Sequence, residues 1–390
     1  MSRQRISIVG GGLAGLTAAI AAAEKGAGVK LFEAHEQLGG RARSTDGPYK
    51  ANLGPHALLC NSPFWAWLGE RDLLPPSARP RLSGFRFRWR NEIRRVPAVG
   101  AAVAALRLRG RTAPIELDFR TWAGEQVGFE AADQIARSAG ILTYHHDPGS
   151  LSAAFIWEPI MRAVLAAPPT TRYPIGGWSA IVERMEQRAR ALGVTIERGH
   201  PVESLPEPPV IVATELRDAR ELLGDDTLQW LSGNAVCVDL VLDHRRGDPY
   251  VVADLQDAGW VERFTAVDRS LAPAGQELIQ AQMPIRPGEP ADAAGARLEQ
   301  LLDASFVDWQ DRERWRRRQI MNGRTGALDP PGKTWRDRPS IDRGSGVFLA
   351  GDMAAAPGCL SEIAWASAMR AAELALAATG EPDPIRSAVA

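Results

Sequence analysis

Three glycines near the start of the chain have the spacing of a dinucleotide-binding turn. Gly10, Gly12 and Gly15 follow the apolar segment 6–9 and open an Ala-rich segment that continues to Lys25. At this spacing the first glycine permits a tight turn and the second lets the backbone approach a pyrophosphate. The third lets the helix and strand pack closely. The phosphates would meet free N–H groups and the positive end of a helix dipole.

An acidic residue completes this unit. Glu33 ends the apolar segment that begins at Val29, and a carboxylate there would accept hydrogen bonds from a ribose diol. A chance glycine turn would not be followed by a helix, a second strand and an acid in this order. The sequence therefore predicts a dinucleotide site whose contacts include Leu13, Ala14 and Ala34.

The next residues identify the dinucleotide through a resemblance. The run from Gln37 to Arg43, LGGRA at its centre, and the run NLGPH at 52–56 resemble the flavin amine oxidase and phytoene desaturase superfamily. The resemblance implies non-covalently bound FAD. Accessible glycine backbone and guanidinium donors suit its phosphates. The implied contacts along the pyrophosphate, ribityl chain and isoalloxazine are Gly39, Gly40, Arg41, Gly54, Pro55 and His56.

Two distant stretches extend the resemblance. Tyr173–Trp178 leads into a helix with a 3.6-residue apolar stripe, and strands are expected at 194–197 and 210–214. Later, the strand 346–350 is followed by Gly351-Asp352 and an Ala-rich helix. The first turn of that helix would face the flavin pyrimidine and stabilise negative charge on it. The resemblance implies contacts from Val202, Ala213, Thr214, Gly351, Asp352, Ile363 and Ala364.

The order of the motifs predicts an α/β fold with a discontinuous domain. We expect a Rossmann-like FAD-binding domain of the GR2 type, interrupted by an α+β substrate domain. The FAD-binding domain would comprise residues 1–80, 174–225 and 338–390. The substrate-binding domain would comprise 81–173 and 226–337.

Within the substrate domain, the alternating segment 85–89 predicts a strand that turns at 91–92 and pairs with 93–96. Residues 98–165 are expected to be mainly helical, and 234–284 to form several strands.

Composition restricts the function further. The 390 residues carry a net charge of −1, which gives no reason to expect nucleic acid, and Cys60, Cys237 and Cys359 are isolated, as suits a reducing cytoplasm. No apolar run is long enough to span a membrane. The basic clusters 86–111 and 312–318 are expected to be solvated faces of a hairpin and a helix. Peripheral membrane contact is the alternative. Nothing indicates an oligomeric state.

Candidate chemistry beside the flavin is sparse. None of the four lysines matches the lysine that the related amine oxidases place in their substrate-domain sheet. This favours dehydrogenation of a largely apolar small molecule, with hydride transfer to flavin N5. No second glycine fingerprint is present, so oxygen or a quinone would reoxidise the flavin. A flavin amine or amino-acid oxidase remains an alternative, as does a non-catalytic FAD-binding scaffold or regulator.

Few side chains are candidates for the reaction itself. His56 could act as a base or polarise substrate, or could simply bond to backbone. Tyr144, Trp178 and Trp365 could line the substrate pocket, although core packing is an equal explanation for the two tryptophans. No metal site is predicted, because the adjacent histidines 145 and 146 would point opposite ways on an extended segment.

Overall fold

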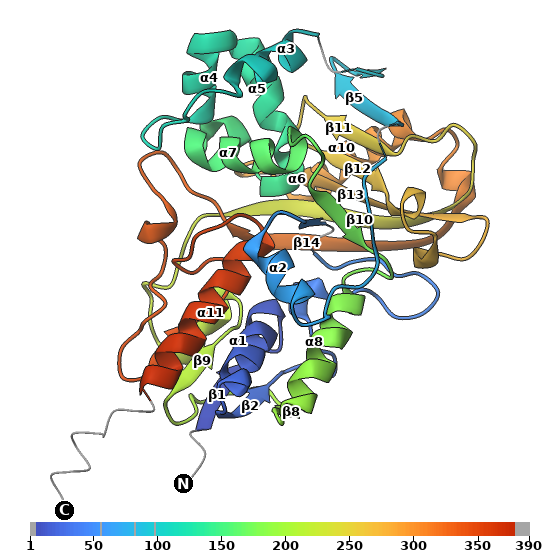
Figure 1. Ribbon diagram of the computed structural model, residues 1–390. Helices are drawn as coiled ribbons and strands as arrows, with labels where there is room; N and C mark the ends of the chain where they lie inside the picture. The colour runs from blue at the N-terminus through green and yellow to red at the C-terminus, as the bar shows by residue number, and fades with distance from the viewer. Residues whose placement is uncertain (1–4, 55–56, 82, 97–98, 379–390) are drawn as a thin grey trace, which may run out of the picture.

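The computed structural model describes residues 5–54, 57–81, 83–96 and 99–378. Figure 1 shows a parallel sheet with its helices in the lower half and a larger sheet above it, next to a group of helices. The predicted α/β class with a Rossmann-like unit is confirmed.

The parallel sheet has five strands in the order β15-β9-β1-β2-β8. All of its pairings are parallel, and its strands come from three distant parts of the chain. The strands are β1 Arg5–Val9, β2 Gly28–Phe32, β8 Thr195–Glu197, β9 Val210–Val212 and β15 Val347–Leu349.

Three helices lie side by side against this sheet, with α1 (Leu13–Glu24) between α8 (Ser179–Ala191) and α11 (Ser361–Ala378) (Figure 1). Helix α1 is buried over Ala14–Ala22, which explains its alanine content: small side chains allow close packing on every side. Gly193 has a φ of +85° just beyond α8, as the predicted C-cap requires. Helices α2 (Pro63–Gly69) and α9 (Leu216–Leu223) complete this half.

The larger sheet has seven strands in the order β14-β10-β13-β12-β11-β5-β6. One face is covered by α10 (Ala291–Ser305) through a buried apolar cluster that includes Val236, Ile279 and Leu298. The strands are β5 Phe85–Trp89, β6 Glu92–Arg94, β10 Ser232–Asp243, β11 Val251–Asp254, β12 Trp260–Arg263, β13 Gln276–Pro284 and β14 Glu313–Ala327.

The strands predicted within 85–96 and 234–284 are present, with two corrections. The hairpin turns at Arg90 and Asn91, both with positive φ, so β6 begins at Glu92 and ends at Arg94 instead of spanning 93–96. The basic cluster 86–111 is also not uniformly exposed. Arg88 is buried and paired with Asp254 at 2.9 Å.

The second basic cluster was expected on a helix, and that prediction is wrong. Residues 313–318 belong to β14, where exposure alternates with a period of two. Arg314, Arg316 and Arg318 are exposed, while Trp315 and Arg317 face inward. Pairing with β10 stabilises the extended conformation, and the two faces of the strand explain why arginines alternate in environment.

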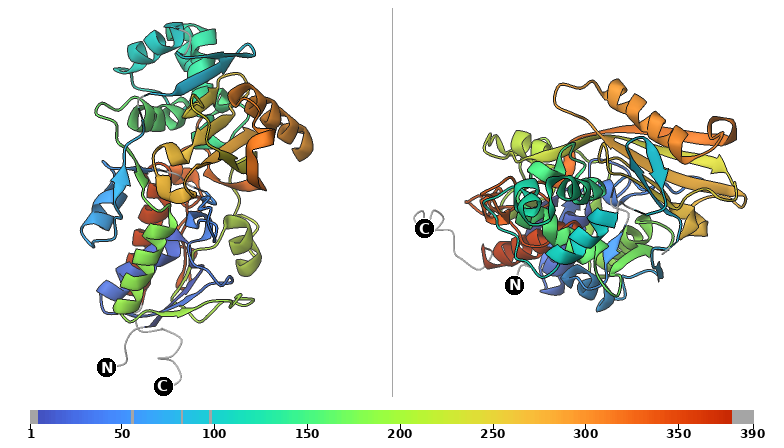
Figure 2. Two further views of the ribbon diagram at one scale, coloured as in Figure 1. Left: turned by 90° about the vertical axis from the view of Figure 1, so that its right-hand side faces the viewer. Right: turned by 90° about the horizontal axis from the view of Figure 1, so that it is seen from above.

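The segment 98–165 is mainly helical over its described residues, as predicted. Figure 2 shows these helices beside the seven-stranded sheet. They are α3 Val99–Leu108, α4 Phe119–Val127, α5 Phe129–Ser138, α6 Gly140–Thr143, α7 Ala153–Pro159 and a π-helical turn Ile160–Val164. A small third sheet joins β3 (Leu58–Leu59), β7 (Thr171–Pro174) and β4 (Ser77–Ala78). Across the described ranges, no helix combines the length and hydropathy needed to cross a membrane.

Candidate cofactor and substrate site

The predicted cofactor contacts gather at the carboxyl edge of the parallel sheet. Gly10 follows β1, Glu33 follows β2, Thr214 lies just after β9, and Asp352 lies just after β15. Strands β2 and β15 are three sheet steps apart, about 14 Å, which suits an extended dinucleotide. Ligands of open α/β sheets bind at this edge.

Gly10, Gly12 and Gly15 each have a different reason to lack a side chain. A Cβ on Gly10, where φ is +106°, would lie 2.6 Å from the Ala213 carbonyl oxygen. A Cβ on Gly15 would lie 1.8 Å from the Gly10 carbonyl oxygen. Gly12 differs, because no described atom lies within 4 Å of the position that a Cβ would take there. The fold itself requires Gly10 and Gly15, whereas the open space at Gly12 fits a bound phosphate.

The start of α1 faces this open space. Gly12 is its N-cap without a side-chain cap, and the first turn, with Leu13 and Ala14, contains no acidic residue. Gly39 forms a bridge to Gly12, and a Cβ on Gly40 would lie 3.5 Å from the Gly12 Cα. Two glycine segments therefore flank a helix N-terminus, and these residues fit a pyrophosphate.

Glu33 is positioned for the ribose end. Its side chain is nearly buried and accepts hydrogen bonds from the N–H groups of Gly11 (2.7 Å) and His35 (2.9 Å). Carboxylate oxygens can each accept more than one bond, so a ribose hydroxyl can still be accommodated. His200 N–H donates to the Glu33 carbonyl, which brings the segment leading to Val202 beside Glu33. Ala34 is exposed next to the acid.

Two predicted cofactor contacts bind each other at the opposite end. The Arg41 guanidinium lies 2.8 Å from an Asp352 carboxylate oxygen and also donates to the Arg324 carbonyl at 2.8 Å. Burial alone would lower the pKa of Arg41, but Asp352 and Glu215 together with Tyr144 outweigh burial, and the pKa is raised. Arg41 is therefore a fixed cation beside the glycine turn. Gly54 packs under it, since a Cβ there would lie 2.6 Å from the Arg41 carbonyl oxygen.

The first turn of α11 packs into the core and carries an ion pair, which the sequence did not indicate. Ile363 and Ala364 are buried as part of the core. Glu362, in the same turn, accepts from the Cys359 N–H at 3.0 Å and pairs with Arg162. A carboxylate and its counter-ion thus already sit at the helix end that was expected to face the flavin.

Sequence reasoning missed Ser367. This buried serine on α11 donates from Oγ to the Gly351 carbonyl and accepts from the Gly351 N–H, both at 2.9 Å. It fixes the backbone immediately before Asp352. The sequence did contain a hint: Ser367 lies in an Ala-rich helix, and a hydroxyl that is buried there needs a hydrogen-bond partner.

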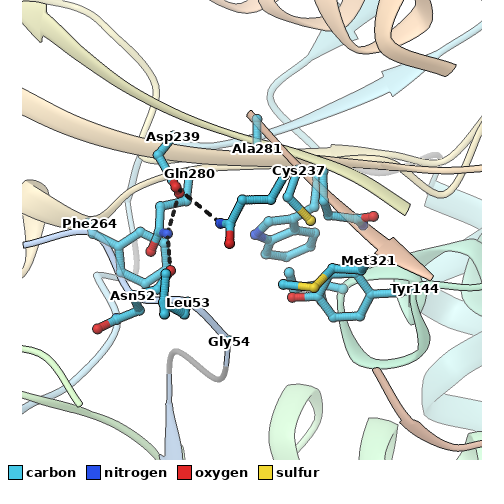
Figure 3. Close-up of a pocket in the computed structure, with 14 residues that line it drawn as sticks. Asn52, Leu53, Gly54, Tyr144, Cys237, Asp239, Phe264, Gln280, Ala281 and Met321 are labelled. Atoms are coloured by element: carbon cyan, nitrogen blue, oxygen red, sulfur yellow. Dashed lines mark hydrogen bonds between the residues drawn. The ribbon is translucent and has the colours of Figure 1, made fainter. Parts of the chain in front are cut away.

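A small, partly open hollow lies between the segment Asn52–Gly54 and the seven-stranded sheet (Figure 3). Tyr144, which is predicted to line a substrate pocket, is one of its lining residues. The lining residues are Asn52, Leu53, Gly54, Ile141, Tyr144, Cys237, Asp239, Trp260, Phe264, Gln280, Ala281, Gln282, Gln319 and Met321.

Other predicted pocket residues do not line this hollow. Trp178 is fully buried in the core beneath the parallel sheet's helices, so the prediction that it lines the substrate pocket is wrong. Trp365 packs against the same core. Core packing, the alternative explanation, describes both. Pro55 and His56 lie outside the described residues.

Polar side chains from three neighbouring strands form one wall of the hollow. Register places Asp239 of β10 between Gln280 of β13 and Arg317 of β14, and Cys237 between Gln282 and Gln319. We call these six residues the polar floor; all of them except Arg317 line the hollow. Asp239 accepts from the Gln280 amide (Figure 3). It also accepts from Arg317 Nε at 2.7 Å. Burial raises the pKa of Asp239 despite the opposing Arg317.

A buried carboxylate lies beside the floor. Glu262 of β12 is opposite Gln280 and accepts from Tyr173 (2.7 Å), Tyr250 (3.1 Å) and the Trp260 indole (3.1 Å). Burial raises its pKa, which the three donors partly oppose. Nothing in the linear spacing of these residues marks them as a cluster.

The remaining reactive groups show little sign of nucleophilic or metal chemistry. Burial raises the pKa of both Cys237 and Cys359 to about 12, so these thiols stay protonated at neutral pH. In the part of the chain that the structure describes, no group of three His, Cys, Asp or Glu side chains could hold a metal ion. The rings of His145 and His146 lie 4.5 Å apart between centroids, so the expectation that they point opposite ways is wrong.

Comparison with known proteins supports the assignment of the fold. Residues 8–70 match the model of an NAD(P)-binding Rossmann-like domain. A 75-residue segment is 46% identical to a carotenoid 3,4-desaturase of Haloarcula japonica. That match spans 18% of this chain and only 15% of the desaturase.

Similarity to solved structures extends over nearly the whole chain. An oxidoreductase from Methanosarcina mazei superposes with a TM-score of 0.78 at 17% identity, over 95% of this chain and 100% of that one. Cyclohexylamine oxidase from Brevibacterium oxydans gives 0.70 at 14% identity, over 97% and 98%. The predicted resemblance is thereby confirmed. The chain contains a Rossmann-like domain within a fold shared by such oxidoreductases.

Proposed function

We propose that the protein is an FAD-dependent oxidoreductase. The observation that carries this proposal is the open space at Gly12, flanked by Gly40 and the uncapped start of α1. Glu33 lies on its ribose side and Arg41 on its flavin side. The dinucleotide is FAD in this proposal because the Gly39-Gly40-Arg41 segment resembles the flavin enzymes and because amine oxidases share the fold.

The chain's own residues would bind and orient the reactants. The Asn52–Gly54 segment links the cofactor edge to the hollow, since Gly54 packs on Arg41 while Asn52 accepts from Gln280. FAD, when bound, supplies a hydride acceptor at flavin N5. Leu53, Ile141 and Met321 add apolar side chains to the lining of the hollow, which suits an apolar substrate body.

We therefore propose dehydrogenation of a small molecule with a largely apolar body, with oxygen or a quinone as the final acceptor. The weak relationship to a carotenoid desaturase is in keeping with this chemistry. An amine or amino-acid oxidase is the second candidate, favoured by the fold shared with cyclohexylamine oxidase. Lys333 does not supply the missing lysine, because it is exposed and lies 3.4 Å from Asp337.

Anaerobic reduction of the bound flavin tests the proposal. The purified protein should be yellow and should release FAD on denaturation. Polyenes, terpenoids and porphyrinogens should then be compared with amines and amino acids as bleaching agents. Colourless protein that takes up no FAD would refute the proposal. Rapid bleaching by a simple amine would select the second candidate, and photoreduction without bleaching by any compound would favour a non-catalytic scaffold or regulator.

A further inference from the structure

Two glutamines of the polar floor have unused acceptor atoms. Gln280 and Gln282 occupy the same face of β13, with Cα atoms about 7 Å apart. Both line the hollow, and both are more than nine-tenths buried. Among the described residues, neither side-chain oxygen has a hydrogen-bond partner.

The orientation of each amide follows from its nitrogen. Gln280 Nε2 donates to the Asn52 carbonyl at 2.9 Å and to the Asp239 carboxylate. Gln282 Nε2 donates to the Ala258 carbonyl at 3.2 Å. Exchanging oxygen and nitrogen would place an acceptor against these acceptors, so the network assigns the oxygens as the free atoms. A buried acceptor without a partner is costly. Both side chains line the hollow, so a small rotation about the last torsion would bring each covered oxygen to a donor bound there.

The two carboxylates near the hollow already have hydrogen-bond partners. Asp239 is paired with Arg317, and Glu262 accepts from three uncharged donors. The acceptors left over are therefore neutral amide oxygens. Such oxygens favour uncharged donors over an ammonium ion, because full desolvation of a cation needs a compensating charge.

We infer that Gln280 and Gln282 are specificity-determining residues that bind the polar end of the substrate through two uncharged donors, either hydroxyl or N–H. The apolar body of the substrate then lies along Ile141, Tyr144 and Met321. This inference rests on the proposed function, since it takes the hollow as the substrate site. It modifies the expectation of a largely apolar substrate by requiring a polar end.

Matched probes test the donor requirement directly. Benzamide carries two amide N–H donors, N,N-dimethylbenzamide has none, and benzylammonium adds a charge to the same ring. Binding is measured on the FAD-loaded protein by thermal shift and by perturbation of the flavin spectrum. Benzamide should bind at least about tenfold more tightly than its dimethyl analogue, as expected for two hydrogen bonds to buried acceptors.

Variants of the polar floor test whether its glutamines cause the preference for benzamide over the dimethyl analogue. Gln282→Met and Gln280→Met should each reduce the preference to less than about threefold. Gln276→Met is the matched control, because Gln276 also lies on β13 and has an unpartnered side-chain oxygen but is not in the hollow. If Gln280→Met does not fold, Gln282→Met decides the matter, since its amide nitrogen contacts only a backbone carbonyl among the described residues.

The outcomes separate the two proposals. Equal binding of the amide pair by wild type, no binding of benzamide, or tighter binding of benzylammonium would each overturn the inference while leaving a yellow protein. Failure to bind FAD would overturn the proposed function, and the thermal-shift comparison could still be made on that protein.

Discussion

The cofactor edge and the polar floor reach their geometry by different means. At the cofactor edge, defined by residues 10–15, 33, 39–41, 213–214 and 351–352, the essential groups are backbone atoms and the spaces beside glycines. On the polar floor the groups are side chains that three strands bring into register. Local turn geometry therefore shapes the glycine turn of the first region, although strand pairing brings residues 213–214 and 351–352 to it, whereas every contact of the second region depends on long-range pairing.

The strongest test of this difference compares two glycines of one turn. Gly15→Ala should destabilise the protein by about 3 kcal/mol or more, because its Cβ would lie 1.8 Å from a backbone oxygen that has little room to move. Urea unfolding measures this loss.

Gly12→Ala is the control within the same turn. Its Cβ meets no described atom, so the unfolding free energy of the apoprotein should change by less than about 0.5 kcal/mol while FAD retention falls. Equal stability losses in both variants would contradict the distinction between a glycine required by the fold and one required by the ligand.

On the floor, Asp239→Ala should cost about 3 kcal/mol of unfolding free energy. It leaves Arg317 without its carboxylate and removes the acceptor of the Gln280 and Gln319 amides. Chemical denaturation of the variant, together with Arg317→Ala and the double variant, measures the coupling. Additive losses would show that the two side chains do not act as a unit.

Glu277, on β13 outside the hollow, should make the unfolding free energy depend on pH under acidic conditions. Burial would raise its pKa, but Thr265, Arg269 and Arg263 outweigh burial and hold the pKa at about 2. Because the folded pKa lies below the unfolded value, this stability is present above about pH 4.5 and is lost as pH falls toward 2. Between pH 5 and pH 2, wild type should lose about 2 kcal/mol more than Glu277→Gln. Thermal melting at several pH values measures this, and equal losses of stability in wild type and Glu277→Gln would refute it.

Glu33→Ala should weaken FAD binding by about 1–2 kcal/mol through the loss of charge-assisted hydrogen bonds. Titration of apoprotein with FAD measures the effect. The Gly11 and His35 N–H groups also lose their acceptor, so a modest loss of apoprotein stability should accompany it. Glu33→Gln, which keeps one acceptor oxygen, should retain part of the affinity. Unchanged affinity in Glu33→Ala would place the ribose elsewhere.

The smallest effect is expected at the exposed end of the same pair of strands. Arg314 and Asp243 form an ion pair between the same two strands as Arg317 and Asp239, but both side chains are well exposed. Water already solvates these charges, so Arg314→Ala should leave the melting temperature and FAD content unchanged. A loss comparable to that of Asp239→Ala would show that burial does not separate the two pairs.

The sequence carried the information for the cofactor edge in its linear spacing. Gly10, Gly12 and Glu33 could be assigned because a turn and the strand beside it are close in the chain. The contacts around Asp352 came from a resemblance, and Ser367 could not be paired with Gly351 because helical periodicity does not indicate which backbone groups face a helix.

The floor could not be predicted for a related reason. Alternation over 234–284 indicates strands, but the partners Asp239, Gln280 and Arg317 meet only through register. The Arg-rich residues of β14 lack the apolar alternation that identifies a strand, and pairing with β10 decides their conformation. Trp178 shows the converse limit: proximity to a cofactor motif in sequence does not indicate which way a side chain points.

The assembly of the parallel sheet from three distant segments also affects how the protein can be made. Strand β1 pairs with β9, which lies some two hundred residues later, and β9 pairs with β15, which is later still. During synthesis the first βαβ unit therefore waits until β9 has been made, about halfway along the chain, before the open edge at β1 is covered. Pairings of such long sequence separation fold slowly and leave strand edges exposed to aggregation. The glycine turn is synthesised long before Gly351 and Asp352, which complete the cofactor edge.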